Sequence, residues 1–183
     1  MDVLFLFTVL LFVLVEPKQK DIAQVVFYSI PKHNVVVFHD NKIAYVFGDS
    51  AFFDNEKLPF YYLRGHLSNL SLRKIEREEF GEFFQSNAIW TDNFHVQYKN
   101  LRGLIVKEDF EIKQSSQSIP LHFCLLSKEV DLKKLLDTYE PKTIILDNNL
   151  SYYSYKQMKK QCKKLGLNYH DLRQSYYSME SKF

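Results

Sequence analysis

The chain has 183 residues, of which 46% are hydrophobic and 25% are charged, so it is long enough for one ordinary domain with its own core. These shares are typical of a globular protein and exclude a disordered, collagen-like or coiled-coil chain. The formal net charge of +2 is too small to indicate nucleic-acid binding from bulk charge, so any basic patch must be local.

Composition also disfavours several kinds of site. Only 5 Gly stand against 16 Phe and 12 Tyr, and neither a G-x-G-x-x-G nor a P-loop pattern occurs, so a loop that cradles a nucleotide phosphate is not expected. The two cysteines, Cys124 and Cys162, cannot build a disulfide framework and lie at no zinc-finger spacing. We predict that both are small buried hydrophobic residues.

The chain opens with an uninterrupted apolar run over residues 3–15, followed by Pro17 and Lys18. The run is shorter than the roughly 20 residues that cross a bilayer, and it lacks the positive start and the cleavage site of a signal peptide. We predict an anchor segment over residues 1–17, either a short anchor or the tail of a transmembrane helix, and one soluble α/β domain over residues 18–183. A cleaved signal and a buried segment are the alternatives.

Dense strand signals follow the predicted anchor. Residues 22–30 and 35–38 are rich in β-branched and aromatic side chains, and residues 43–47 follow an Asp-Asn dipeptide suited to a hairpin turn. This pattern predicts a three-stranded meander.

The middle of the chain mixes two patterns. Residues 55–84 combine helical spacing with clusters of charge, which favours helix. Residues 94–98 and 101–107 then read as a second hairpin around Lys99-Asn100.

The C-terminal third alternates between strand and helix patterns. The predicted elements are a strand over 121–126, a helix over 130–139, a strand over 143–146, a helix over 153–165 that ends at Gly166, and a strand over 167–172. This β-α-β-α-β order predicts helices packed on a partly parallel sheet, so the fold class is α/β or α+β, a layered sandwich with an N-terminal meander.

The six histidines do not form a metal-binding motif. They stand at positions 33, 39, 66, 95, 122 and 170, and no two are at the short spacings that zinc hydrolases use. His33 and His39 point to the same face of a predicted strand but are about 20 Å apart. We expect a structural or exposed role for each histidine.

Carboxylates at strand ends are weaker candidates for a site. Asp109 and Asp147 follow predicted strands at the ends where α/β folds keep their sites, and Gly48-Asp49-Ser50 forms a similar corner. The nucleophile-elbow pattern G-x-S-x-G is absent. We expect loop caps and turns at these positions, with a hydrolase site as the alternative.

The strongest local pattern is a row of lysines on the last predicted helix. The candidate phosphate contacts, spaced to share one helix face, are Lys156, Lys159, Lys160, Lys163 and Lys164. Tyr155, Met158, Cys162 and Leu165 form the opposite, apolar stripe. The lysine face is either an ordinary solvated surface or a contact for nucleic-acid phosphates or anionic lipid headgroups.

Two runs of sequence carry a resemblance to a known family. They are VVFYSIPKHNVVVFHDNKIAYVFGDS, residues 25–50, and PKTIILDNNLSYYSYKQMKKQCKKLGLNYHDL, residues 141–172. They resemble the C-terminal soluble domain of the ComEC family of competence DNA-uptake channels, in the form carried by Bacteroidota. Typical members of that family resemble a metallo-β-lactamase in this region, with an H-x-H-x-D-H metal loop that is absent here, where His66 is the only histidine between Ser50 and Ala88.

The resemblance implies a degenerate metallo-β-lactamase-like domain without catalytic residues, metal or cofactor, tethered to the inner membrane on its exterior side and associated with DNA uptake. The expected partners are single-stranded or duplex DNA, the membrane through residues 3–15, and a channel protein, with no small-molecule substrate. A diverged hydrolase that uses Asp49, Asp109 and Asp147 is one alternative, and an envelope interaction domain unrelated to DNA is another.

Overall fold

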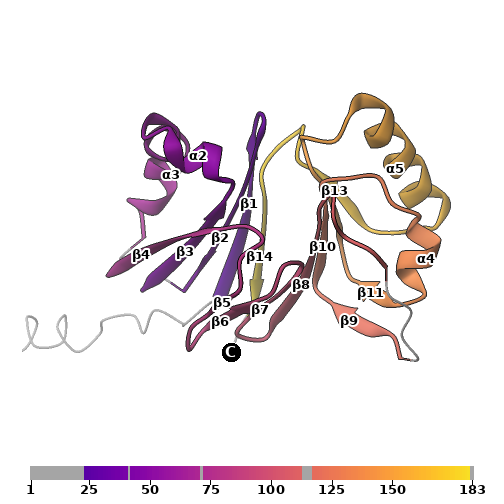
Figure 1. Ribbon diagram of the computed structural model, residues 1–183, viewed down its shortest axis with the longest axis horizontal. Coiled ribbons are helices and arrows are strands. Elements are labelled where there is room, and N and C mark those ends of the chain that lie inside the picture. The colour runs from indigo at the N-terminus through magenta and orange to yellow at the C-terminus, as the bar shows by residue number, and fades with distance from the viewer. Residues whose placement is uncertain (1–22, 41, 71, 113–116, 182–183) are drawn as a thin grey trace, which may run out of the picture.

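The computed structural model describes residues 23–40, 42–70, 72–112 and 117–181, and these form a mixed α/β sandwich. Two main mixed sheets lie face to face, a pair of helices covers the outer side of each, and a small two-stranded sheet lies beside the second (Figure 1). The predicted layered α/β sandwich is confirmed at this level.

The first sheet contains the predicted meander and has the order β14-β1-β2-β3-β4. Its strands are β1 (Ala23–Ile30), β2 (His33–His39), β3 (Ile43–Gly48), β4 (Lys74–Glu79) and β14 (Tyr177–Ser181). All neighbours are antiparallel except β3 and β4, which run parallel because a helical crossover connects them.

The second sheet has the order β13-β12-β10-β8-β7-β6-β5. Its strands are β5 (Phe84–Gln85), β6 (Ile89–Thr91), β7 (His95–Tyr98), β8 (Leu101–Val106), β10 (Phe123–Leu126), β12 (Ile144–Leu146) and β13 (Tyr169–Asp171). The strands β8, β10, β12 and β13 run parallel, and the predicted hairpin of β7 and β8 turns at Lys99, whose φ is 53°. The small sheet pairs β9 (Ile119–Leu121) with β11 (Tyr139–Pro141).

The helices of the described chain lie on the two outer faces. They are α2 (Ser50–Asp54), α3 (Lys57–Leu67), α4 (Leu132–Leu136) and α5 (Tyr152–Lys164). The side chains of Asp49, Asp131 and Ser151 accept hydrogen bonds from backbone N–H groups at the starts of α2, α4 and α5. Gly166, at φ 64°, follows the end of α5, as its place in the sequence predicts.

Three hydrophobic clusters correspond to the three spaces between the layers. In β2, Val36 and Phe38 face the second sheet, whereas Val35 and Val37 face α2 and α3. Because both faces of this strand are buried, its sequence is a continuous apolar run rather than an alternating one. On the far side, Met158 and Cys162 of α5 pack on the second sheet, as the predicted apolar stripe requires.

Three local predictions are wrong. The helix predicted over 130–139 is only the short α4, because Tyr139 instead enters the strand β11. Within 55–84 only α3 is a long helix, and residues 74–79 form the edge strand β4. The strand predicted over 121–126 is divided at His122, so that β9 and β10 belong to different sheets.

The predicted anchor over residues 3–15 lies outside the described residues. In the part of the chain that the structure describes, no helix is both long enough and apolar enough to span a membrane.

Candidate functional site

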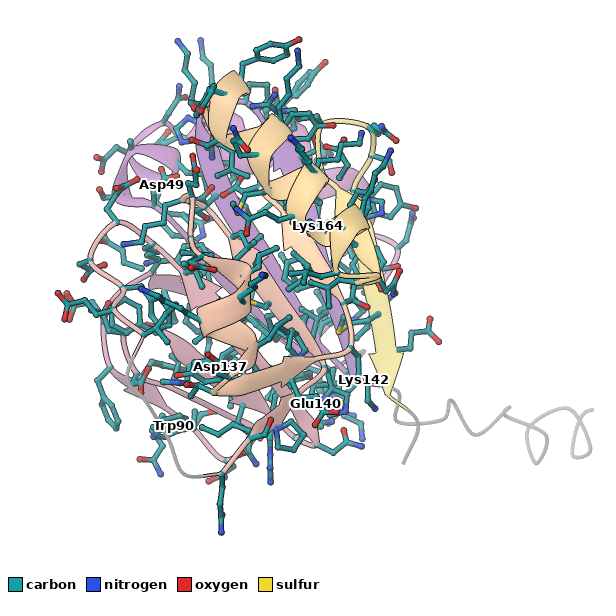
Figure 2. All side chains as sticks on the ribbon, turned by 90° about the vertical axis from the view of Figure 1, so that its right-hand side faces the viewer. Asp49, Trp90, Asp137, Glu140, Lys142 and Lys164 are labelled. Atoms are coloured by element: carbon teal, nitrogen blue, oxygen red, sulfur yellow. The ribbon has the colours of Figure 1, made fainter. Side chains whose placement is uncertain are left out.

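Four aspartates follow the ends of strands at one edge of the sandwich, which we call the strand-end edge. Asp49 follows β3, Asp109 follows β8, Asp147 follows β12, and Asp171 is the last residue of β13. Strands β8, β12 and β13 are parallel, so their ends come to the same edge of the second sheet. Asp49 stands at the upper end of the molecule in Figure 2.

The Asp49 carboxylate is held by groups of the first sheet and of α2. Its Oδ1 lies 2.8 Å from Nδ1 of His33 and accepts a hydrogen bond of 2.8 Å from the Phe52 N–H. Its Oδ2 accepts the Asn34 backbone N–H at 2.9 Å. This carboxylate therefore caps α2 and fixes the start of β2, as the expectation of a turn at Gly48-Asp49-Ser50 implies.

The Asp147 carboxylate is nearly buried, with 2% of the residue exposed, and it joins the two sheets. The Ser127 hydroxyl donates to its Oδ2 at 2.5 Å, and the Asn149 N–H donates to Oδ1 at 3.1 Å. We assign the Asn34 amide with its nitrogen toward this carboxylate, since that orientation places a donor 2.5 Å from Oδ2. Burial raises the pKa of Asp147 above its ordinary value, and these hydrogen bonds oppose the rise.

A lysine lies near the carboxylates of Asp49 and Asp109. Lys107 follows β8, and its ammonium lies 4.7 Å from the centre of the Phe80 ring. Burial lowers the pKa of Lys107 to about 8, against the attraction of Asp109 and Asp49. Asp109 is more exposed and accepts a hydrogen bond of 3.0 Å from the Asn93 amide. The strand-end edge thus contains the ammonium group of Lys107 among its carboxylates.

Asp171 is the centre of a second group at this edge. The Tyr155 hydroxyl donates to its Oδ2, and the Arg173 N–H donates to Oδ1 at 3.1 Å. Two cations lie near the Tyr155 ring, with the Arg173 guanidinium 4.3 Å and the Lys159 ammonium 5.2 Å from its centre.

Two arrangements that would serve a hydrolase at the strand-end edge are a metal-binding group and a catalytic triad. Among the described residues, no group of three His, Cys, Asp or Glu side chains is arranged to hold a metal ion. Ser127 donates to Asp147, whereas His33 pairs with Asp49, so the described residues of the strand-end edge show no Ser–His–Asp relay. The prediction that the chain carries no metal and is not an enzyme stays a prediction.

Most of the other histidines form hydrogen bonds within the protein, and the rings of two of them lie in contact. The His95 ring joins Asp92 to the Tyr139 hydroxyl, and His170 contacts the Ser175 carbonyl. The rings of His39 and His66 lie 5.2 Å apart, a contact that no sequence spacing indicates. His66 also hydrogen-bonds the Tyr28 hydroxyl, whereas neither ring nitrogen of the buried His39 has a partner among the described residues.

The predicted lysine face lies on α5, which is in front in Figure 2 with Lys164 labelled. Lys156, Lys160, Lys163 and Lys164 are exposed. Lys159 differs, because its ammonium donates to the Tyr155 hydroxyl at 2.8 Å and lies 3.6 Å from Asp171. Four of the five lysines therefore remain available to a ligand, and the fifth holds α5 against β13.

Sequence reasoning missed Asn34, Ser127, Lys107 and Asp171 as parts of the strand-end edge. Ser127 and Lys107 directly follow β10 and β8, so the rule that sites lie at the ends of parallel strands could have found them. No local signal indicates Asn34, which reaches Asp147 from the opposite sheet.

Comparison with models of protein families gives a match that covers most of the chain. The model of a protein family described as the ComEC C-terminal domain matches residues 25–180, which is most of the described chain and includes the middle that the two quoted runs do not cover. No curated protein gives a significant match.

Proposed function

Since the chain belongs to the family of the ComEC C-terminal domain, we propose that it is a non-catalytic, membrane-tethered domain that contacts DNA during natural competence. Membership of the family associates the chain with competence and DNA uptake in a membrane-protein context. The remaining parts of the proposal, its lack of catalysis, its tether and its DNA contact, rest on the strand-end edge, the apolar run over residues 3–15 and the lysines of α5.

The observation that carries the non-catalytic part is the hydrogen bonding of the strand-end carboxylates. Asp49 and Asp147 accept hydrogen bonds from the chain itself, and Lys107 supplies a positive charge near Asp49 and Asp109. A hydrolytic zinc centre needs three or four convergent ligands and an open position for water. Asn34 and Ser127 instead fill the space over Asp147 and connect the sheets, which supports a structural role for this edge.

The order of the layers supports a reduced metallo-β-lactamase-like sandwich. Two mixed sheets lie between two pairs of helices, and the chain crosses from the first sheet to the second after β4. In this proposal the strand-end edge corresponds to the place of the metal centre in typical members, with residues 101–109 where a strand ending in Gly-Asp would be and residues 125–128 where the histidine turn would be.

The membrane part of the proposal rests on the apolar run over residues 3–15, which precedes the first described strand by only a few residues. The run would hold the domain at the inner membrane on its exterior side, beside a channel protein. Fractionation tests this part: the intact chain should remain with membranes after a high-salt wash, and a wholly soluble chain would contradict the tether.

Metal analysis and a nuclease assay test the absence of catalysis. The purified intact chain should hold no stoichiometric zinc or manganese after dialysis and should not degrade DNA when these ions are added. Near-equimolar bound metal, or nuclease activity lost on Asp147→Ala, would support the hydrolase alternative.

The DNA contact is proposed for the exposed lysines of α5. Each phosphate that a lysine neutralises releases counterions, so log K should fall with log salt by about 0.7 per contact on single strands. Replacing Lys160, Lys163 and Lys164 by Gln should therefore reduce the salt slope by about two. Lys159 is left in place, because its contacts with Tyr155 and Asp171 are structural.

The matched control removes three exposed lysines elsewhere, by the changes Lys32→Gln, Lys57→Gln and Lys133→Gln. Both triple variants lower the net charge equally, so a difference between their salt slopes would come from local phosphate contacts of the α5 lysines. An equal reduction of the slope in both variants would reduce the α5 lysines to an ordinary solvated face.

A further inference from the structure

The edge of the sandwich opposite the strand-end edge carries a basic groove that the proposed function does not use. Strands β8, β10 and β12 begin at this edge, and turns from the two sheets are joined there by an ion pair of 2.7 Å between Asp40 and Lys99. Both partners of this pair are largely shielded from solvent. We call this end of the molecule the strand-start edge.

The groove has a volume of about 510 Å³ and lies between β8 and the small sheet of β9 and β11. Its charged and titratable lining residues are Arg102, His122, Glu140 and Lys142. Among the described residues, neither the Arg102 guanidinium nor the Lys142 ammonium forms an ion pair, and both residues are exposed. Glu140 is the one acidic lining residue of the groove, so the lining remains net positive.

The His122 ring adds a directed donor to this groove. Its Nδ1 accepts a hydrogen bond of 3.1 Å from the Arg102 backbone N–H, so the hydrogen of the neutral ring is on Nε2. Burial lowers the pKa of His122, and the nearby charges of Lys142 and Arg102 lower it further. Two cations and an N–H donor therefore lie in one groove, which is the chemistry that binds a phosphate group.

We propose that the strand-start edge docks on an anionic phospholipid surface, with headgroup phosphates bound between Arg102, His122 and Lys142. The inference rests on the tether of the proposed function and adds to it a defined orientation of the domain. The strand-end edge and the start of α5 then face away from the bilayer.

The course of the chain favours a membrane over DNA as the partner of this groove. The strand β1 begins at Ala23 beside the end of β2, which leads into Asp40, so the chain enters the domain at the strand-start edge. Only eight peptide units separate Val15, the end of the apolar run, from Ala23, and they span at most about 28 Å when fully extended. A tether at the bilayer would therefore hold this edge close to the headgroups.

The single tryptophan of the chain offers a direct assay. Trp90 is 38% exposed and pairs in register with Gln97, which lines the groove. In Figure 2 it lies at the lower end of the molecule with Glu140 and Lys142, whereas Asp49 is at the upper end. Energy transfer from Trp90 to a dansyl-labelled lipid therefore reports whether the strand-start edge approaches the bilayer.

The intact chain would be reconstituted in phosphatidylcholine vesicles with or without phosphatidylglycerol. We expect stronger transfer with the anionic lipid and a decrease on addition of salt. Each positive charge near an anionic surface contributes about fivefold to binding, so Arg102→Gln with Lys142→Gln should weaken docking about 25-fold. Glu140→Gln should strengthen it, and the control pair Lys32→Gln with Lys57→Gln should leave it unchanged.

The contrary outcomes are distinct. Equal energy transfer to neutral and anionic vesicles, or no loss of transfer in the Arg102 and Lys142 variant, would overturn the proposal. If the chain still floated with the vesicles in that case, the membrane tether would not be contradicted. Loss of single-stranded DNA binding in that variant, with lipid transfer unchanged, would make the groove a nucleic-acid contact. Abolition of transfer by inorganic phosphate at constant ionic strength would make it a site for free phosphate instead.

Discussion

The network around Asp147 allows a quantitative test of the strand-end edge. The Ser127 hydroxyl lies 2.5 Å from the Asp147 carboxylate, and Asp147 is only 2% exposed. Water therefore cannot replace this hydrogen bond unless the surrounding side chains rearrange. A hydrogen bond to a charged group contributes about 1.5–3 kcal/mol, so Ser127→Ala should lower the free energy of unfolding by about 2 kcal/mol at pH 7. Asn34→Ala removes the donor from the opposite sheet and should cost a similar amount.

The pH dependence of this loss distinguishes the network from simple packing. Burial raises the pKa of Asp147 in the folded chain, so the folded state holds this proton at pH values where the unfolded chain has released it. The stability that this protonated carboxyl group contributes is therefore complete below the pKa of Asp147 in the unfolded chain. It is lost as the pH rises through the higher pKa of Asp147 in the folded chain. The hydrogen bond from Ser127 opposes the rise in this pKa, so removing it should raise the folded pKa further. The penalty of the substitution should therefore be larger at pH values above the folded pKa than below it, where it should shrink toward about 1 kcal/mol.

Urea unfolding of the intact chain at several pH values would measure both effects. Ser118→Ala, at an exposed serine, is the matched control and should change stability by less than about 0.5 kcal/mol. A loss below about 0.5 kcal/mol for Ser127→Ala, or a loss that does not vary with pH, would refute the stabilising role of the hydrogen bond from Ser127 to the buried Asp147 carboxyl group.

Three further outcomes follow from the core. Gly103→Ala should destabilise the fold by about 3 kcal/mol in urea unfolding, because the new Cβ would lie 2.0 Å from the buried Phe123 ring; a cost below about 1 kcal/mol would contradict this packing. Burial raises the pKa of the Cys124 thiol and raises that of Cys162 to about 11. Neither thiol should therefore react with Ellman's reagent at pH 8 until urea unfolds the chain, and rapid reaction of the native chain would contradict this. Burial lowers the pKa of His39 to about 4, so the stability that the neutral ring contributes above pH 6.5 is lost as the pH falls toward 4. His39→Phe should flatten this loss of stability in acid, and an unchanged pH profile would exclude His39 as the source of the loss.

The parts of the fold that sequence could predict are those whose burial leaves a pattern in the residues. The first three strands are buried on both faces, so β-branched and aromatic runs mark them, and their observed bounds lie close to the predicted ones. The helix α5 was predictable for the complementary reason, because one apolar stripe and one charged face alternate at helical spacing.

The strand β4 shows where this signal ends. Its sequence, Lys-Ile-Glu-Arg-Glu-Glu, lies at the free edge of the first sheet, and most of its side chains are exposed or half-buried. Charged residues suit an exposed edge strand because they discourage pairing with another chain, but the same composition is typical of a surface helix. The extended form of this segment comes from parallel pairing with β3, a tertiary contact that no local pattern encodes.

The strand-end edge could be predicted only in part, for a similar reason. The rule that sites follow the ends of parallel strands identified Asp109 and Asp147, and the corner Gly48-Asp49-Ser50 added Asp49; all three do lie at this edge. It could not say that Asn34, 113 residues earlier in the chain than Asp147, would meet that carboxylate from the other sheet. Whether a carboxylate can bind a metal ion depends on such neighbours, so the distinction between a site and a structural network requires the folded structure.

The topology also limits how much DNA the α5 lysines can contact. The helix runs from the end of β12 back to the start of β13, so its 13 residues extend about 20 Å from the strand-end edge toward the strand-start edge. With Lys159 held by Tyr155 and Asp171, four lysines remain, and a single strand crossing this face should give a salt slope no steeper than about −3. A measured slope much steeper than this would require phosphate contacts outside α5. If such excess slope disappeared with Arg102→Gln and Lys142→Gln, the DNA would extend onto the strand-start edge and compete there with the membrane.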